Sequence, residues 1–280
     1  MKNFLKLGEF EIYWLNGGMT EFDGGTMFGA VPKVLWSKKY PTTDNYIQIT
    51  NSPLLIKTPK ALVLIETGLG NKLTDKQKKI FRVSREWGVP ADLLSLGFAR
   101  ENIDYVILTH CDFDHAGGIV MSDNKKEGRL TFPNASHIIQ EIEWHDAMNP
   151  NRRSAHTYWP QNFSELKDTK NLYLVDGIFQ VCDGIEVRRT GGHTKGHQMV
   201  RLESEGEVAY HLADLLPTHA HFNPLWIMAY DNFPLEVVEL KEQLENKAIQ
   251  ENGWFTFYHD PFMYACKFDQ EGNIISRLAR

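Results

Sequence analysis

The chain has 280 residues, of which 42% are hydrophobic and 24% are charged, so it has enough apolar residues for a buried core. This composition excludes a disordered, collagen-like or coiled-coil chain. The 30 Lys and Arg residues against 36 Asp and Glu residues leave a net charge of -6, which argues against nucleic acid as a partner. No window approaches the roughly 18 consecutive apolar residues of a membrane span, so no membrane association is expected.

Alternating and β-branched runs, separated by Gly, Pro, Asn and Asp, predict a sheet-rich first quarter of the chain. The strands expected there are 10–15, 46–49, 54–58 and 61–66. Two helices are expected next, at 75–85 and 90–96, the second with Pro90 in its first turn. The nearly all-apolar run 104–109 then predicts a strand that is buried on both faces.

Strands outnumber helices in the rest of the chain. The expected elements are strands at 136–140, 185–190, 199–203, 208–212, 254–258 and 264–268, and helices at 141–148 and 235–251. The absence of repeats and of a Gly/Ser-rich or Pro-rich linker favours one layered α/β domain over residues 1–280. The stretches 16–44 and 150–170 resist assignment, and their aromatic content predicts ordered loops that either border a site or pack over the core.

The three cysteines, Cys111, Cys182 and Cys266, are odd in number and widely spaced, so no disulfide framework is expected. The first ten residues mix charged residues with short apolar stretches, unlike a signal peptide. A reducing, cytoplasmic setting is the simplest expectation.

Four side chains of metal-binding type fall within six positions directly after the apolar run, namely His110, Asp112, Asp114 and His115. Alternate side chains of an extended segment share a face, so His110 and Asp112 can converge on one ion. A turn would direct Asp114 and His115 to another ion, and the Gly-Gly pair that follows permits such a turn. The spacing therefore predicts a metal site.

Three further candidates each lie just beyond a β-like run. They are His193 in G-G-H-T-K-G-H, Asp214 in H-L-A-D-L-L-P and His259 in F-Y-H-D-P. A ligand at the end of a strand is held by a rigid element and faces the loops that form a cavity. Each alone would more often be an ordinary surface or core residue, but together with the first cluster they are expected to be ligands.

These residues resemble the pattern of the metallo-β-lactamase superfamily, H-x-H-x-D-H, then G-H-T-x-G-H, then an aspartate and a late histidine. Within it, three segments look like the quorum-quenching N-acyl-homoserine lactonase group. They are W-L-N-G-G at Trp14, M-F-G-A-V-P-K-V-L-W from Met27 and A-D-L-L-P-T-H-A-H-F-N-P-L-W from Ala213. The resemblance implies an αββα four-layer sandwich with a metal site at the edge between its two sheets.

The same resemblance implies the roles of the site residues: His110, Asp112 and His193 would hold a first metal, Asp114, His115 and His259 a second, and Asp214 would bridge them. Asp114 and Asp214 are the residues expected to act in catalysis. Two divalent cations, zinc first, would supply a hydroxide that attacks a lactone or related ester, without a protein nucleophile.

Two positions depart from the family pattern. Asp112 stands where the pattern has a histidine, and a ligand set richer in oxygen shifts the metal preference from zinc toward manganese or iron. Glu66, in E-T-G-L-G, stands where the family has aspartate, and Glu66 and His197 are the candidates for orienting the ligands from outside.

A tyrosine that follows the bridging aspartate in the lactonases is absent here, where Leu215, Leu216 and Pro217 follow Asp214, and Tyr230 is a spatial substitute to test. The expected substrate-binding residues are Phe28, Trp36, Trp159, His219, His221, Trp226 and Tyr230, although core packing is the commoner fate of such aromatic residues. The expected partner is a small-molecule ester or lactone, and a homodimer stays open.

Two alternatives remain beside the lactone hydrolase. A phosphotriester or phosphodiester hydrolase would use the same two metals, and a diester would require a basic cluster beside the cavity. The candidates for that cluster are Lys33, Lys38, Lys39, Arg152 and Arg153. The second alternative is a metal-binding protein of the same fold that has lost catalysis.

Overall fold

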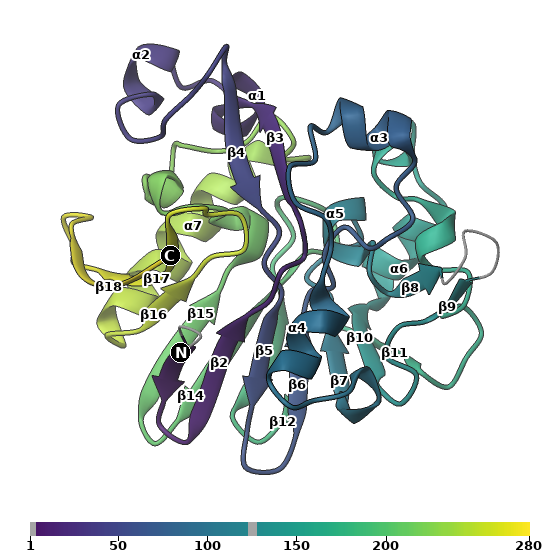
Figure 1. The fold of residues 1–280 in the computed structure, drawn as a ribbon. Helices are drawn as coiled ribbons and strands as arrows, with labels where there is room; N and C mark the ends of the chain where they lie inside the picture. The colour runs from purple at the N-terminus through teal and green to yellow at the C-terminus, as the bar shows by residue number, and fades with distance from the viewer. Residues whose placement is uncertain (1–3, 123–127) are drawn as a thin grey trace.

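Two seven-stranded β-sheets face each other at the centre of the structure (Figure 1). The computed structural model describes residues 4–122 and 128–280, so the first three residues of the amino-terminal segment considered above lie outside it. The first sheet has the order β1 (Phe4–Leu7), β2 (Phe10–Trp14), β5 (Leu54–Lys57), β6 (Leu62–Ile65), β7 (Tyr105–Ile107), β10 (Ser136–Gln140) and β11 (Leu172–Val175). The second has the order β12 (Ile178–Cys182), β13 (Ile185–Arg189), β14 (Gln198–Ser204), β15 (Glu207–His211), β16 (Trp254–Thr256), β17 (Met263–Phe268) and β18 (Ile274–Ala279).

Parallel pairs occur at β6 with β7, β7 with β10, β10 with β11 and β15 with β16, and the other pairs within the two sheets are antiparallel. Parallel neighbours need crossover connections, which here carry the helices α3 to α7. The helices are α1 (Gly24–Phe28), α2 (Lys33–Trp36), α3 (Asp75–Ile80), α4 (Val89–Ser95), α5 (Phe113–Ala116), α6 (Glu141–Met148) and α7 (Pro234–Gln250). The short 3-10 helices are η1 (Arg100–Asn102), η2 (Ser154–His156), η3 (Pro160–Asn162), η4 (Ala213–Leu215) and η5 (His219–Phe222). Two small two-stranded sheets complete the fold of the described residues. One pairs β3 (Met19–Asp23) with β4 (Tyr46–Thr50), and the other pairs β8 (Val120–Ser122) with β9 (Gly128–Leu130).

The central strands β6 and β7 of the first sheet are apolar on both faces, as the run 104–109 predicts. In β6, Val63 and Ile65 pack into the space between the sheets, and Leu64 packs into the core on the outer face. Side chains alternate across a strand, so a strand covered on both faces has no polar position. Each such buried side chain contributes about 1.5–3 kcal/mol to stability before the entropy of ordering is subtracted.

Three apolar cores therefore separate four layers. Leu93 of α4 and Trp144 of α6 pack against the outer face of the first sheet. Val237 and Leu244 of α7 pack against the second sheet, where Tyr210 and Phe255 are fully buried. The αββα sandwich implied by the sequence resemblance is confirmed.

The expected elements are recovered best in the sheet interiors. The helix expected at 141–148 coincides with α6. The helix α7 begins and ends one residue before the helix expected at 235–251. The helix expected at 75–85 ends at Ile80, because the chain reverses at Arg82, whose φ of 48° is left-handed. The strands that the sequence pattern missed include all four sheet edges, β1, β11, β12 and β18.

The stretch 16–44 is more regular than expected, because it contains β3, α1 and α2. With β4 these elements form a lobe, here called the β3–β4 lobe (residues 19–50), which stands above one end of the sandwich in Figure 1. The lobe has its own apolar core, in which Phe28 stacks on Trp36 with ring centroids 5.1 Å apart. The stretch 150–170 contains η2 and η3 and adds Tyr158 and Phe163 to the core outside the first sheet.

Within the described residues, no helix is long and apolar enough to cross a membrane. The three cysteines are free thiols, in agreement with the expectation that no disulfide framework is present.

The fold places the turn after β6 in close contact with the glycines that follow α5. A Cβ atom at Gly70 would lie 2.0 Å from the backbone oxygen of Gly117, and Gly70 has a φ of +66°. We expect Gly70→Ala to lower the free energy of unfolding by about 2–5 kcal/mol, as the sum of left-handed strain and overpacking. Chemical denaturation would measure this loss.

Gly206→Ala is the matched control. Gly206 has a φ of +79°, but a Cβ atom added there would have no described atom within 4 Å, so only the backbone strain of about 1–2 kcal/mol is expected. Equal losses in the two variants would contradict the close contact at Gly70.

Candidate functional site

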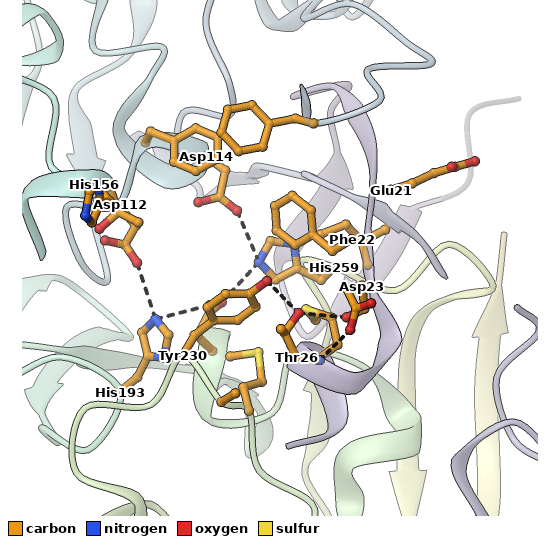
Figure 2. Close-up of a pocket in the computed structure, with 18 of the residues that line it drawn as sticks. Glu21, Phe22, Asp23, Thr26, Asp112, Asp114, His156, His193, Tyr230 and His259 are labelled. Carbon is orange, nitrogen blue, oxygen red and sulfur yellow. Dashed lines mark hydrogen bonds and ion pairs between the residues drawn. The ribbon is translucent and has the colours of Figure 1, made fainter. Parts of the chain in front are cut away.

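Seven side chains predicted as metal ligands converge where both sheets end. His110, Asp112, Asp114 and His115 follow β7 of the first sheet. His193 follows β13, Asp214 follows β15 and His259 follows β16 of the second sheet. Figure 2 shows Asp112 and His193 directed toward one another on one side of the site, and Asp114 and His259 on the other. The site therefore lies at the edge between the sheets.

The first set of donors surrounds one carboxylate oxygen of Asp214. His193 Nε2 lies 3.4 Å from Asp214 Oδ2 and 3.5 Å from Asp112 Oδ2. His110 Nε2 lies 4.0 Å from Asp214 Oδ2 and 3.7 Å from Asp112 Oδ2. Two nitrogens and two oxygens are thus directed at one small volume.

The second set of donors surrounds the other oxygen of the same aspartate. The Nε2 atoms of His115 and His259 each lie 3.2 Å from Asp214 Oδ1, and they lie 3.2 Å from one another. Asp114 Oδ2 is 3.9 Å from His115 Nε2 and 3.7 Å from His259 Nε2. Asp214 is therefore shared by the two sets.

These separations fit two divalent cations. Four donors bound tetrahedrally at about 2.0–2.2 Å lie about 3.3–3.6 Å apart, close to the distances observed in both sets. The Nε2 atoms of His110 and His193 are buried without a hydrogen-bond partner among the described residues, a costly arrangement unless a cation is bound. Imidazole and carboxylate together suit zinc, manganese and iron, so the donor chemistry alone leaves the metal open.

The protonation of Asp214 and His110 agrees with this use, whereas His115 and His193 differ. Burial would raise the pKa of Asp214, but the neighbouring His115 and His259 hold it well below its ordinary value, so the carboxylate is charged. Burial, with His115 close by, lowers the pKa of His110 well below its ordinary value and favours the neutral imidazole that binds metals. Burial would also lower the pKa values of the His115 and His193 imidazoles, but the carboxylates around them, Asp214 first, raise the values well above the ordinary one, so a cation would have to displace a proton from each.

Each of the four histidines has its Nδ1 atom beside a group outside the two sets. His193 Nδ1 lies 2.8 Å from Asp231 Oδ1, and His115 Nδ1 lies 3.2 Å from Glu66 Oε1. His259 Nδ1 lies 2.9 Å from the Thr50 carbonyl oxygen, and His110 Nδ1 lies 3.0 Å from Thr109 Oγ1. The contacts of His193, His259 and His110 are hydrogen bonds, which fix the tautomer and the ring orientation and direct Nε2 toward the centre. The contact of His115 with Glu66 is an ion-pair distance without hydrogen-bond geometry.

Glu66 and Ala213 border the site, and the backbone of each is strained in the left-handed region. Glu66 is fully buried, has a φ of 65° and accepts hydrogen bonds from the amide and the hydroxyl of Thr109. Ala213, directly before Asp214, has a φ of 46°. Left-handed non-glycine residues are uncommon and concentrate at functional sites.

His197 lies beside the first set but belongs to neither set. Its ring centroid is 5.4 Å from that of His110, and its Nδ1 atom is 2.7 Å from Thr190 Oγ1. Glu66 and His197 thus both lie beside the donor sets, and their role in orienting the ligands stays a prediction.

Two residues at the site were missed by the sequence reasoning. Asp231, besides its contact with His193, accepts a hydrogen bond from the Met228 amide. Glu143 is buried in α6, where burial raises its pKa to about 7, against the hydrogen bonds that it accepts from Thr194 and Tyr158. Both are distant in sequence from the residues they hold, so no local pattern could identify them.

A cavity of about 630 Å³ opens above the donors. Asp112, Asp114, His193, Asp214 and His259 contribute to its lining. Its walls are largely aromatic and apolar, and they include Phe22, Phe81, Phe113, Met27, Met228 and Tyr230.

Of the seven residues expected to bind substrate, Tyr230 lines this cavity and six do not, among the described residues. This corrects the expectation for Phe28 and Trp36, which are 0% and 1% exposed because they form the core of the β3–β4 lobe. His221 is stacked on Phe28 with ring centroids 4.5 Å apart, and Trp226 packs edge-on against Phe28 with centroids 5.8 Å apart, so both belong to the same core.

The remaining two corrections concern His219 and Trp159, neither of which lines the cavity. His219 lies against Asp260, whose carboxylate also accepts the His219 amide at 2.8 Å. Trp159 stacks on Phe113 with centroids 4.4 Å apart and so supports a ring that lines the cavity, without lining it. Aromatic character alone did not distinguish the cavity wall from the layer that packs behind it.

Comparisons with known proteins agree with this geometry. Residues 49–127 match the family model of the metallo-beta-lactamase superfamily. The structure is similar to a probable metal-dependent hydrolase from Staphylococcus aureus, with 40% identity, a TM-score of 0.94 and coverage of 99% of both chains.

Two similarities are more distant. AidC, a dizinc quorum-quenching lactonase, shares the fold with a TM-score of 0.80 and 22% identity, over 99% of this chain and 96% of that chain. An N-acyl homoserine lactonase of a Bacillus species is 24% identical over 161 residues, which are 54% of this chain and 57% of that enzyme. The match thus spans little more than half of this curated relative. From the family match, the likeness to the Staphylococcus aureus protein and the shared fold, we conclude that the chain belongs to the metallo-β-lactamase superfamily.

Proposed function

We propose that the protein is a dinuclear metal-dependent hydrolase that opens a lactone or a related carboxylic ester, with N-acyl-homoserine lactones as the first class to test. One observation carries the proposal: two donor sets share Asp214 beneath an open cavity with apolar walls. Relatives named as lactonases support the substrate class. Asp114 and Asp214 are the carboxylates that we assign to the reaction centre.

The chain's own residues suit attack by water. When bound, two divalent cations supply a Lewis acid and a water of lowered pKa, and zinc is the metal we propose first, with manganese or iron favoured by Asp112. Cys111, the nucleophile-type side chain within the ligand run, is fully buried, and burial raises its pKa well above the ordinary value of a thiol. A thiolate attack is therefore disfavoured.

The charge of the cavity favours a neutral substrate. Glu21 and Asp23 contribute to its lining beside the three aspartates of the donor sets. Arg153 is the one Lys or Arg among the described residues that line it, and its guanidinium donates to Asn232 Oδ1 and to the Ala229 carbonyl, each at 2.7 Å. The described residues that line the cavity therefore do not form the basic cluster that a phosphodiester substrate would need. A neutral phosphotriester remains as the comparison substrate.

The first prediction concerns metal content and turnover. Purified without chelator, the protein should carry close to two metal ions per chain, and Asp214→Ala should lose both bound metal and lactone turnover because Asp214 serves both sets. Elemental analysis for Zn, Mn and Fe and an assay over lactones, aryl esters and a phosphotriester would measure this.

Glu21→Gln is the control for that experiment, since Glu21 lines the cavity outside both sets and should leave the metal content unchanged. A wild-type protein with no bound metal would overturn the proposal. Two metals with turnover of the phosphotriester alone would replace the lactone by the alternative substrate, and two metals without turnover of any substrate would favour the non-catalytic alternative.

The second prediction concerns Tyr230. Its hydroxyl lies 2.7 Å from Thr26 Oγ1 and borders the cavity, and burial raises its pKa, so it stays protonated and able to donate to a substrate carbonyl. Tyr230→Phe should lower kcat/KM about tenfold, the effect of one lost hydrogen bond, with metal content unchanged. Tyr46→Phe, at another tyrosine of the same cavity, should have little effect, and equal losses in the two variants would count against a specific role for Tyr230.

The third prediction concerns Asp231. Asp231→Asn removes the charge beside His193 Nδ1 while keeping an acceptor for the Met228 amide. Loss of such a partner commonly weakens metal binding about 10- to 100-fold, so zinc should dissociate from the first set at lower chelator concentration. Competition with a chromophoric chelator would measure this, and unchanged affinity would show that Asp231 does not act through His193.

A further inference from the structure

Glu143 is a buried carboxylate that belongs to neither donor set yet contacts the chain around one of them. Its side chain accepts three hydrogen bonds: Oε1 from the Cys111 amide at 2.8 Å and from the Tyr158 hydroxyl at 2.7 Å, and Oε2 from the Thr194 hydroxyl at 2.7 Å. The residue is 1% exposed. A buried carboxyl group with this many donors is held firmly and holds its donors in return.

Two of these donors are neighbours of ligands in the first set. Cys111 lies between His110 and Asp112, and Thr194 follows His193. Glu143 therefore connects, through one side chain, the loop of His193 to the segment 110–115, at the point between His110 and Asp112. The same segment continues to Asp114 and His115 of the second set.

The second set is held by other contacts. His259 is fixed through its hydrogen bond with the Thr50 carbonyl oxygen, and His115 lies within ion-pair distance of Glu66. The carbonyl of Asp114 accepts the Tyr258 hydroxyl at 2.6 Å. None of these contacts involves Glu143.

The loop of His193 also lies directly against α6. A Cβ atom at Gly196 would lie 2.4 Å from both the Cβ and the amide nitrogen of Glu143. This close approach explains the glycine in G-H-T-K-G-H and leaves the Glu143 side chain little freedom to move.

The third donor, the Tyr158 hydroxyl, connects Glu143 to the wall of the cavity. Tyr158 precedes Trp159, which stacks on Phe113 at 4.4 Å, and Phe113 lies between Asp112 and Asp114 in the chain. The same carboxylate thus contacts the two loops of the first set and the 150–170 stretch.

We propose that Glu143 is a positioning residue that fixes the ligand geometry of the first donor set, and not of the second, by joining the two ligand loops to the 150–170 stretch. The inference rests on the proposed metal pair, but its readout is metal affinity and not turnover. A carboxylate accepts from all three partners, whereas a glutamine that keeps its oxygen toward Cys111 and Tyr158 would direct its NH₂ group at the Thr194 hydroxyl, which would then have to accept instead of donate.

The test measures the zinc affinity of each set separately. His259→Ala should retain zinc in the first set and His193→Ala in the second, and Glu143→Gln is introduced into each background. With free Zn²⁺ fixed by a metal buffer, Glu143→Gln should weaken zinc binding about 10- to 100-fold in the His259→Ala background. It should change the affinity less than about twofold in the His193→Ala background.

Glu245→Gln is the matched control. Glu245 is also a buried glutamate, but it lies in α7, and its substitution should not change zinc affinity in either background. Equal weakening by Glu143→Gln in both backgrounds, or no weakening in either, would overturn the inference.

Two milder variants keep the test decisive if Glu143→Gln fails to fold. Tyr158→Phe and Thr194→Val each remove one donor and leave the carboxylate in place. Each should weaken zinc binding severalfold in the His259→Ala background alone, and the absence of that weakening would contradict the inference. A protein that binds two zinc ions with the expected dependence on Glu143, but hydrolyses no lactone, would contradict the proposed substrate and leave the role of Glu143 supported.

Discussion

The two oxygens of Asp214 face two separate groups of buried imidazoles, and much of the surrounding structure serves to keep these groups together. The ring centroids of His110 and His115 are 3.9 Å apart, and three aspartates lie among them at the end of an apolar sandwich. Groups of this kind lose their hydration on burial, and two divalent cations are the simplest way to compensate that loss. The donors come from both sheets, so the site also depends on the packing of one sheet against the other.

The strands next to the site offset the backbone strain of two residues that border it. Glu66 follows β6 and Ala213 follows β15, and each adopts a left-handed backbone that costs about 1–3 kcal/mol. β6 is paired on both sides and apolar on both faces, and β15 is paired with β14 and β16. The strained residues begin where these strands end, so the strain is confined to the turns that direct side chains toward the donors.

The sequence allowed the interior of the fold and the group of residues that converge at the site to be predicted, but not the sheet edges or the cavity wall. Interior strands such as β7 are apolar because both faces are covered, whereas the edge strand β18 has no buried residue and reads as a polar loop. The expected ligands were visible because four side chains of metal-binding type fall within six positions. Phe28 and Trp36 were expected at the cavity because an aromatic residue in an unassigned stretch has no pattern that separates wall from core. Asp231 and Glu143 act through tertiary contacts alone, which no local pattern records.

Asp112 shows how one substitution alters the chemistry while the geometry persists. Its carboxylate still lies 3.5 Å and 3.7 Å from the Nε2 atoms of two histidines, so the position can serve as a ligand although the family pattern has a longer imidazole there. The adjacent Cys111 amide is held by Glu143. Three carboxylates would offset three of the four positive charges of two divalent cations, where the family pattern of two would offset only half. A weaker positive field, below a cavity that already carries Glu21 and Asp23, attracts anions less. The same carboxylate that would shift the metal preference toward manganese or iron would therefore also favour the proposed uncharged ester or lactone over a charged phosphodiester.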